Sequence, residues 1–194
     1  MEQSSTDRRV RKTKKQLRLA LMELLAEKSA KSISVRELTE RADINRGTFY
    51  IHYKDVYDLL SSLEDELADG LTVVCRRHNA KDSEGKTYPY LMELYQFIQQ
   101  NSDLCHVLLG KNGDIAFTDR ICHILRDEFL YDFLAYYYPN DPVMLDYFCS
   151  FIVSGNMSLA LTWIDNGMKQ TPEEMAVLAG EIIMHGVKVL ETKA

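Results

Sequence analysis

The amino-acid sequence predicts an all-α protein, with a small three-helix unit at the N-terminus and a larger helical domain after it. Apolar residues recur at helical spacing along most of the chain, and no stretch has the apolar–polar alternation of a half-buried strand. Ser, Thr, Asp and Asn repeatedly precede these apolar runs, at positions where helix N-caps belong. The predicted units are residues 1–55, a connecting helix over 56–78, and residues 79–194.

Charge is divided unevenly between the two parts. Residues 1–55 hold 13 Lys/Arg against 8 Asp/Glu, a balance of +5, whereas residues 56–194 hold 10 against 21, a balance of −11. The net charge of −6 hides this asymmetry. A basic head on an acidic body indicates that the head meets a polyanion while the body is repelled by it.

The elements can be placed in chain order from their apolar stripes and caps. Ser34 with Glu37, and Thr171 with Glu174, form capping-box patterns, and Asn45 can cap a short helix. The polar segment 79–86 is expected to be a loop. The expected helices cover Thr13–Lys28, a short run from Ser34, Arg46–His52, a long run from Val56, Pro89–Gln100, Asp103–Leu109, Asp114–Tyr137, Asp141–Asn166 and Pro172–Glu191.

The most informative stretch is residues 34–54, SVRELTERADINRGTFYIHYK. Two short helices joined by a tight turn, braced by the preceding helix, make a helix-turn-helix unit for DNA binding. Arg46 begins the second helix, where a guanidinium can reach guanine O6 and N7. Gly47 costs roughly 1 kcal/mol in a helix relative to alanine, and close approach to DNA is one reason to keep it. Phe49 and Tyr53 are expected to turn inward.

The run from Val10 to Leu63, especially NRGTFYIHYKDVYDLL, resembles the DNA-binding domain of the tetracycline-repressor (TetR) family. A glycine after the first recognition-helix residue, an aromatic pair and a final His–aromatic–Lys carry the resemblance. Ile51 is expected either to touch a thymine methyl group or to pack. The resemblance implies base contacts from Arg46, Gly47 and Thr48, and phosphate contacts are predicted for Ser34, Asn45, Tyr50, His52 and Lys54.

Two further segments near this motif have phosphate-binding potential. The basic tail Arg8–Lys12 suits phosphate or minor-groove contacts, and equally suits a solubilising role. The helix after Lys54 is expected to present free backbone N–H groups, which also suit a phosphate.

The family's second domain binds an effector and forms a homodimer, so the resemblance implies both here. Two recognition helices about one DNA turn apart, or a modest multiple, would read a palindromic operator. The helix Asp141–Asn166 is apolar almost all round and is expected to be buried on several sides. The predicted dimer interface combines it with the last helix, through Phe151, Gly155, Leu159, Leu178, Ile182, Gly186 and Val189.

A small-molecule effector is expected, although its identity cannot be obtained from the sequence. The alternative for each aromatic in the second domain is that it simply fills the core. FLAYYYP, SGNMSLALTWIDNGM and TPEEMA resemble the subgroup with regulators of dihydroxyacetone-kinase operons, some of which activate transcription with a protein partner. A DNA-bound activator with a protein coactivator is therefore the alternative to a repressor. The predicted pocket residues are Phe97, Phe129, Phe133, Tyr137, Phe148 and Trp163.

Other classes of function find little support. No GxSxG, HExxH, phosphate-binding loop or dinucleotide-binding glycine motif occurs, so no enzyme is predicted and no cofactor is required. A metal-responsive regulator is an alternative, because the chain contains Cys75 and His78 and the adjacent Cys–His pairs at 105–106 and 122–123. Adjacent residues on a helix point in different directions and are poor chelates, so no metal site is predicted. No stretch is judged to approach a membrane span, and the basic N-terminus lacks a cleavable apolar segment, so a cytoplasmic location is expected.

Overall fold

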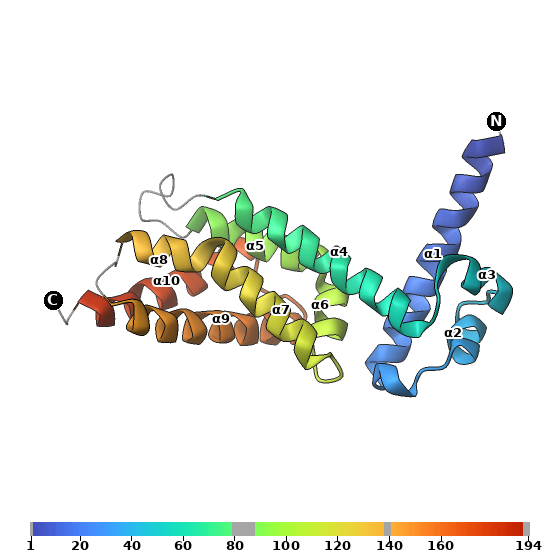
Figure 1. The fold of residues 1–194 in the computed structure, drawn as a ribbon. Coiled ribbons are helices and arrows are strands. Elements are labelled where there is room, and N and C mark those ends of the chain that lie inside the picture. Colours follow the sequence, from blue (N-terminus) through green and yellow to red (C-terminus); the bar gives the residue numbers. More distant parts are fainter. Residues whose placement is uncertain (1, 79–87, 138–140, 192–194) are drawn as a thin grey trace.

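The computed structural model describes residues 2–78, 88–137 and 141–191, and within these it leaves out the side chains of 2–7, 129, 136, 137 and 186–191. The predicted loop over 79–86 lies outside the described residues. Three helices gather at one end and a larger bundle at the other, with the long helix α4 (Val56–Arg76) running between them (Figure 1). All regular elements within the described ranges are helical, which confirms the predicted all-α class.

The N-terminal helices hold the helix-turn-helix. Around Asp43, Ile44 N–H donates to Thr39 O (3.0 Å) and closes the turn. Asp43 has φ = 52°, a left-handed conformation that Asp tolerates better than most residues. Leu21, Leu38 and Phe49, one from each helix, have no exposed surface and form the centre of this unit. The elements are α1 (Glu2–Glu27), η1 (Ala30–Ser32), α2 (Val35–Arg41) and α3 (Arg46–His52).

Helix α1 begins at Glu2, eleven residues earlier than the sequence prediction of Thr13. Residues 2–12 contain no Gly or Pro and are rich in Arg, Lys, Gln and Glu, so nothing in them stops a helix. The basic segment Arg8–Lys12 is therefore helical rather than a tail, and the first turns of α1 project beyond the other N-terminal helices (Figure 1).

The larger bundle confirms most predicted boundaries within one or two residues. The predicted single helix Asp114–Tyr137 is helical from Ile115 onward, after the Asp114 N-cap, but a π-helical turn separates its two α-helical parts. Asp141 Oδ1 accepts from Met144 N–H (3.0 Å) and starts the next helix. The helices are α5 (Tyr88–Gln100), α6 (Ser102–Leu109), α7 (Ile115–Leu125), the π-helical η3 (Arg126–Leu130), α8 (Tyr131–Tyr137), α9 (Pro142–Asp165) and α10 (Pro172–Glu191).

Helix α9 is buried on one face within the chain, and its exposed face includes Phe151 of the predicted dimer interface. Leu145, Cys149 and Ile152 are buried in the bundle, whereas Tyr147 and Phe151 are 69% and 70% exposed. By length and composition α9 could also cross a membrane, which corrects the prediction that no such stretch exists. The same test is passed by core helices of soluble proteins, and the buried face of α9 fits that case.

Two contacts join the N-terminal helices to the bundle and α4. Arg18 on α1 pairs with Glu66 on α4, with Nη1 to Oε2 at 2.5 Å. Asn112, in the turn after α6, donates from Nδ2 to the carbonyls of Leu25 (3.2 Å) and Ala26 (3.4 Å) near the end of α1. These carbonyls lie in the last turn of a helix, where acceptors lack helical partners. Both connections therefore tie α1 to α4 and to the turn after α6.

Candidate nucleic-acid interface

Packing of two aromatic rings determines which face of α3 points outward. Phe49 is fully buried and Tyr53 is half-buried, with ring centroids 5.9 Å apart, as predicted for both. Burial raises the pKa of Tyr53. Tyr50 and Ile51 consequently face solvent, 58% and 77% exposed. Ile51 therefore packs little against the described residues, and its contact with a thymine methyl stays a prediction.

The start of α3 is fixed by its cap. Asn45 Oδ1 accepts from Gly47 N–H at 2.7 Å, as the capping prediction requires. A Cβ on Gly47 would lie only 3.2 Å from that same Oδ1. Glycine at this position is therefore explained partly by the cap, which is a reason that the sequence did not reveal. Arg46 directly follows Asn45 and is exposed at the first turn of the helix.

Ion pairs divide the cations of the helix-turn-helix into two sets. Lys28 pairs with Glu37 (2.6 Å), Arg36 with Glu40 (2.8 Å) and Arg41 with Glu27 (3.0 Å). The Arg41 guanidinium hydrogen-bonds to Glu27 and lowers the pKa of that carboxyl. Arg46 and Lys54, both exposed, have no ion pair with any described residue. Arg46 and Lys54, both predicted to bind DNA, are thus unpaired among the described residues, as is the exposed Lys31 of η1.

The remaining predicted contact residues surround α3. Ser34 is exposed and caps α2 through Oγ, which accepts from Glu37 N–H at 3.2 Å. Only half of the capping box forms, because the Glu37 carboxylate pairs with Lys28 instead. Thr48 and His52 are half-buried on α3.

The start of α4 differs from the sequence expectation of free N–H groups. Asp58 Oδ2 accepts from Lys54 N–H (2.8 Å), and Asp55 Oδ1 accepts from Asp58 N–H (2.9 Å). Two carboxylates at this helix end also repel a phosphate. This terminus is therefore a poor phosphate site, and the Lys54 side chain remains the cation of this region.

Sequence reasoning considered Arg8–Lys12 for phosphate contacts but missed that this segment is part of α1, which runs beside α3. Lys14 Nζ lies 6.0 Å from the centre of the Tyr53 ring, so it covers the inward aromatic of the recognition helix. Arg8, Arg11, Lys12 and Lys15 are exposed on the projecting part of α1. The absence of helix-breaking residues from this segment was the available signal.

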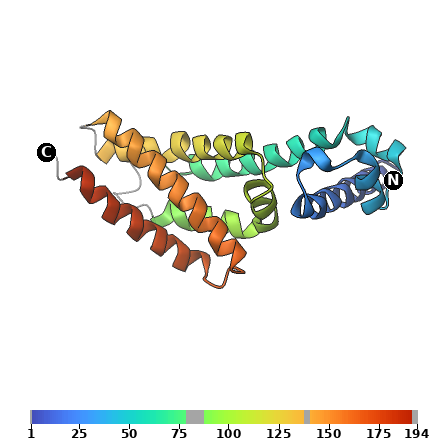
Figure 2. The ribbon, with the colours of Figure 1, turned by 90° about the horizontal axis from the view of Figure 1, so that it is seen from below.

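Most of the predicted dimer residues lie on one exposed surface, where α9 and α10 run side by side (Figure 2). Phe151 and Gly155 are exposed on α9, and Leu178 and Ile182 are nearly half exposed on α10. A groove of about 350 Å³ is lined by Phe151, Gly155, Ile182 and half-buried Leu159, among others. No atom lies within 4 Å of a Cβ built on Gly155. The side chains at 186 and 189 lie outside the described set.

The four predicted pocket aromatics with described side chains do not gather around one cavity. Phe97 lines a cavity in the bundle. Phe133 and Trp163 are buried in the core and Phe148 is half-buried. The side chains of Phe129 and Tyr137 lie outside those described.

The cysteines and histidines proposed for metal sensing are not brought together. Within the described ranges, no three His, Cys, Asp or Glu side chains are grouped to hold a metal ion. Cys75 and Cys105 are buried, and burial raises their pKa to about 11 and about 12. His78 Nε2 lies 2.8 Å from Glu93 Oε2, and His106 Nδ1 lies 3.0 Å from Asp165 Oδ1. Of the residues that suggested a metal-responsive regulator, Cys75, His78, Cys105 and His106 are thus engaged elsewhere or buried in the part of the chain that the structure describes.

Similarity to known proteins covers both parts of the chain. A curated relative, the uncharacterized HTH-type transcriptional regulator YxbF of Bacillus subtilis (strain 168), is 25% identical over 184 residues, covering 90% of this chain and 45% of that protein. The chain thus spans less than half of that relative. A TetR transcriptional regulator from Streptococcus agalactiae 2603V superposes with a TM-score of 0.64 at 25% identity, over 93% of this chain and 98% of the other.

The helical arrangement is also shared with the dihydroxyacetone kinase operon activator DhaS, at a TM-score of 0.51 and 16% identity, over 91% of this chain and 97% of that chain. This fits the resemblance of the second half to that subgroup. Residues 17–63 match the family described as bacterial regulatory proteins, tetR family, and residues 85–185 match a transcriptional regulator C-terminal region. The chain therefore belongs to the TetR family of DNA-binding transcriptional regulators, a family without enzymatic activity.

Proposed function

We propose that two copies of the chain bind a palindromic operator in the cytoplasm, repress transcription, and are released by a small molecule. Residues 1–55 would be the DNA-binding domain, α4 the connection, and residues 79–194 the effector-binding and dimerisation domain. The observation that supports DNA binding is that some cations of this domain are in ion pairs and others are not. Arg46 and Lys54 remain without described ion-pair partners, while Lys28, Arg36 and Arg41 are engaged by carboxylates.

In this proposal α3 lies in the major groove. Arg46, Gly47 and Thr48 at its first turn approach base edges, because this end of a recognition helix faces the groove floor. The phosphate contacts come from Ser34, Asn45, Tyr50, His52 and Lys54. Asn45 uses its Oδ1 for the cap, so the Nδ2 group would donate to the phosphate.

A homodimer is supported by the exposed surface of α9 and α10. Tyr147, Phe151 and Ile182 form an apolar surface that a monomer would leave in water. A two-fold axis through this surface would pair α9 and α10 with their copies, and the open space around Gly155 lets helices approach closely. The two α3 helices would then face successive major grooves of a palindrome.

The test is fluorescence anisotropy with the DNA that flanks the gene, against scrambled DNA, over a salt series. We expect selective binding by a dimer, with affinity that falls steeply as salt rises. Arg46→Ala should lose most of the selectivity, while Arg36→Ala, which alters a paired cation, should keep it. Equal binding of both DNAs, followed by failure to select any sequence from random DNA, would refute the proposal.

An activator that works with a protein coactivator is the second candidate, favoured by the similarity of the fold to the activator DhaS. Deleting the gene distinguishes the two. Transcription of the adjacent operon rises if the protein represses it and falls if the protein activates it.

A further inference from the structure

Helix α1 contains a run of cations without an acidic residue among them. Residues 8–18 hold seven Arg and Lys and no Asp or Glu. Arg18, the last of the seven, pairs with Glu66 of α4. The other six are exposed and have no ion pair with any described residue: Arg8, Arg9, Arg11, Lys12, Lys14 and Lys15.

Four of these cations lie on one side of α1. With 3.6 residues per turn, an arc of about 100° around the helix axis contains Arg8, Arg11, Lys12 and Lys15. The buried side of α1 lies opposite this arc, and Leu17 is its first residue without exposed surface. The four cations, here termed the α1 stripe, therefore face away from the core and extend about 10 Å along the axis.

The like charges of the α1 stripe are neighbours on the helix surface. Arg8 and Lys12 are four residues apart, as are Arg11 and Lys15. Like charges at this spacing repel each other and destabilise the helix. A polyanion that neutralises the stripe would remove this repulsion, so the first part of α1 should gain stability when such a partner binds.

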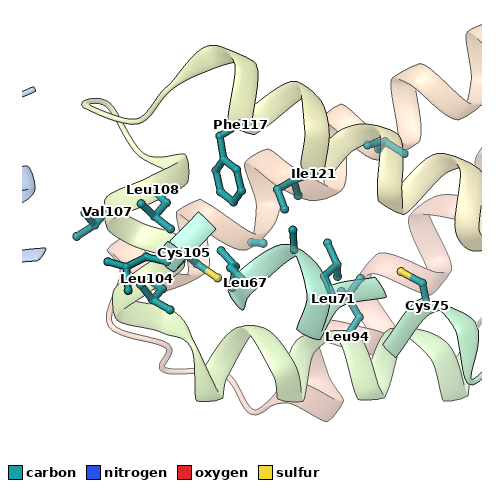
Figure 3. Close-up of a cluster of buried hydrophobic side chains, with 14 of the residues drawn as sticks. Leu67, Leu71, Cys75, Leu94, Leu104, Cys105, Val107, Leu108, Phe117 and Ile121 are labelled. Carbon is teal, nitrogen blue, oxygen red and sulfur yellow. The ribbon is translucent and has the colours of Figure 1, made fainter. Parts of the chain in front are cut away.

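Among the described residues, the larger bundle provides no counter-charge for the α1 stripe. Its interior is apolar, as Figure 3 shows where the side chains of Leu67, Leu71 and Leu94 gather. Two of its carboxylates, Glu93 and Glu128, pair with arginines near the end of α4. The first turns of α1 project from the end of the molecule opposite the bundle (Figure 1). The counter-charge must therefore come from outside the chain.

Lys14 places the α1 stripe beside the predicted DNA-reading helix. Its Nζ lies 6.0 Å from the centre of the Tyr53 ring, and Tyr53 ends α3 directly before Lys54. Arg11 precedes Lys14 by three residues, which makes the two neighbours on the surface of α1. The stripe therefore begins close to the last predicted phosphate contact of α3.

We propose that the α1 stripe is a second DNA-binding element, which binds the duplex phosphates next to those contacted by Lys54. Its helical form decides between the two kinds of contact open to this segment. An α-helix is about 10–12 Å wide and does not fit a minor groove about 6 Å wide. Over about 10 Å of duplex axis each strand presents about three phosphates, which matches the length of the stripe. The inference rests on the proposed function in taking duplex DNA as the partner of α3.

The test combines four substitutions in the full chain: Arg8→Gln, Arg11→Gln, Lys12→Gln and Lys15→Gln. Gln removes the charges and has a similar helix propensity. Fluorescence anisotropy over a salt series uses a duplex selected from random DNA and a scrambled duplex. The combined variant should bind both at least about tenfold more weakly and by the same factor. The slope of log K against log salt concentration should fall by about three units, because each lost phosphate contact lowers it by about 0.9.

A matched control removes four exposed cations that lie outside the N-terminal helices: Arg76, Lys111, Arg120 and Lys169. Their replacement by Gln gives the same net charge as the combined variant. A difference between the two proteins therefore reflects the position of the charges and not their sum. The control should keep the affinity and the salt slope of the parent.

Thr13→Pro distinguishes a helical element from a mobile basic tail. It keeps every cation but interrupts the helix before residue 13. Proline is tolerated in the first turn of the shortened helix that remains, so the buried part of α1 should stay folded, which thermal unfolding checks. Affinity for both duplexes should fall toward that of the combined variant.

Parental affinity and salt slope in the combined variant would overturn the inference, and so would an equal loss in the matched control. Unweakened binding by Thr13→Pro would also overturn it, because a mobile tail would then suffice. The scrambled duplex separates this inference from the proposed function. If the parent selects no sequence yet loses binding to the scrambled duplex in the combined variant, the operator proposal fails and the α1 stripe stands.

Discussion

The exposed faces of α3 and α9 both present large apolar side chains to solvent, but they differ in what surrounds those side chains. On α3, Tyr50 is 58% exposed and lies between unpaired cations at 46 and 54. On α9, Phe151 is 70% exposed and lies beside Ile182 of α10, itself 49% exposed. Exposure alone therefore does not identify a partner. The cations next to Tyr50 suit the binding of a polyanion to α3. The groove beside Phe151 has no charged lining residue, which suits contact between α9 and a second copy of the chain.

The largest expected effect comes from a charge placed on the apolar face. Phe151→Glu should give a folded monomer, because two buried carboxylates would repel each other across the dimer axis. Loss of the second α3 should weaken operator binding about 100-fold or more. Light scattering measures the mass and anisotropy the affinity.

Ile115→Glu is the matched control, since Ile115 is 79% exposed at the start of α7, away from this face. It should remain dimeric. A Phe151→Glu variant that is still a dimer would mean that another surface holds the two copies together.

Arg46→Ala should cost about 1–3 kcal/mol on the cognate operator and much less on non-specific DNA. The reason is the loss of a bidentate contact to one base, so discrimination should fall at a single position in each half-site. A panel of operators with single base changes measures this. If the variant weakens all sequences by the same factor, Arg46 contacts the backbone and not a base.

Lys54→Ala should weaken binding to all DNA sequences alike. The slope of log K against log salt concentration should fall by about one unit for each phosphate contact that the variant loses. Lys28→Ala provides the comparison, because Lys28 is held by Glu37 at 2.6 Å. Its salt slope should stay that of the parent. A slope for Lys54→Ala that matches the parent would exclude a phosphate contact.

Asn112→Ala should have the smallest effect, on coupling between the two parts of the chain. Loss of its bonds to Leu25 O and Ala26 O should leave operator affinity nearly unchanged and reduce the effect of a bound ligand by about 0.5–2 kcal/mol. The measurement is operator affinity with and without the ligand. If the ligand changes operator affinity equally in the variant and the parent, the Asn112 contact does not link the ligand site to the DNA-binding helices, and α4 alone would provide that link.

Local chemistry made much of the recognition unit predictable from sequence. The α3 bounds Arg46–His52 followed from the Asn45 cap and the inward Phe49, both of which act within a few residues. The start of α1 was misplaced because a cap was sought where residues 2–12 simply continue the helix. The sequence could not predict that the Glu37 carboxylate pairs with the Lys28 ammonium group and does not complete the capping box with Ser34. That outcome depends on how the end of α1 packs against α2.

The interior of the bundle was less predictable for the same reason. Aromatic residues were taken as pocket walls, yet Trp163 and Phe133 fill the core. That Tyr95 Oη and Asn156 Oδ1 lack hydrogen-bond partners among the described residues could not be predicted, since this is a property of the packed structure and not of the residue type. On α9 the sequence did place Phe151 on a predicted dimer face, and Phe151 is exposed, but Tyr147 on the same helix was not singled out although it is 69% exposed.

Selection from random double-stranded DNA with the wild-type protein, followed by sequencing of the bound fraction, tests the central claim most directly. The account predicts an inverted repeat whose half-sites lie about one DNA turn or a modest multiple apart, bound by two chains. Enrichment of a single asymmetric half-site would contradict the dimeric arrangement, and no enrichment of any sequence would contradict sequence reading by α3.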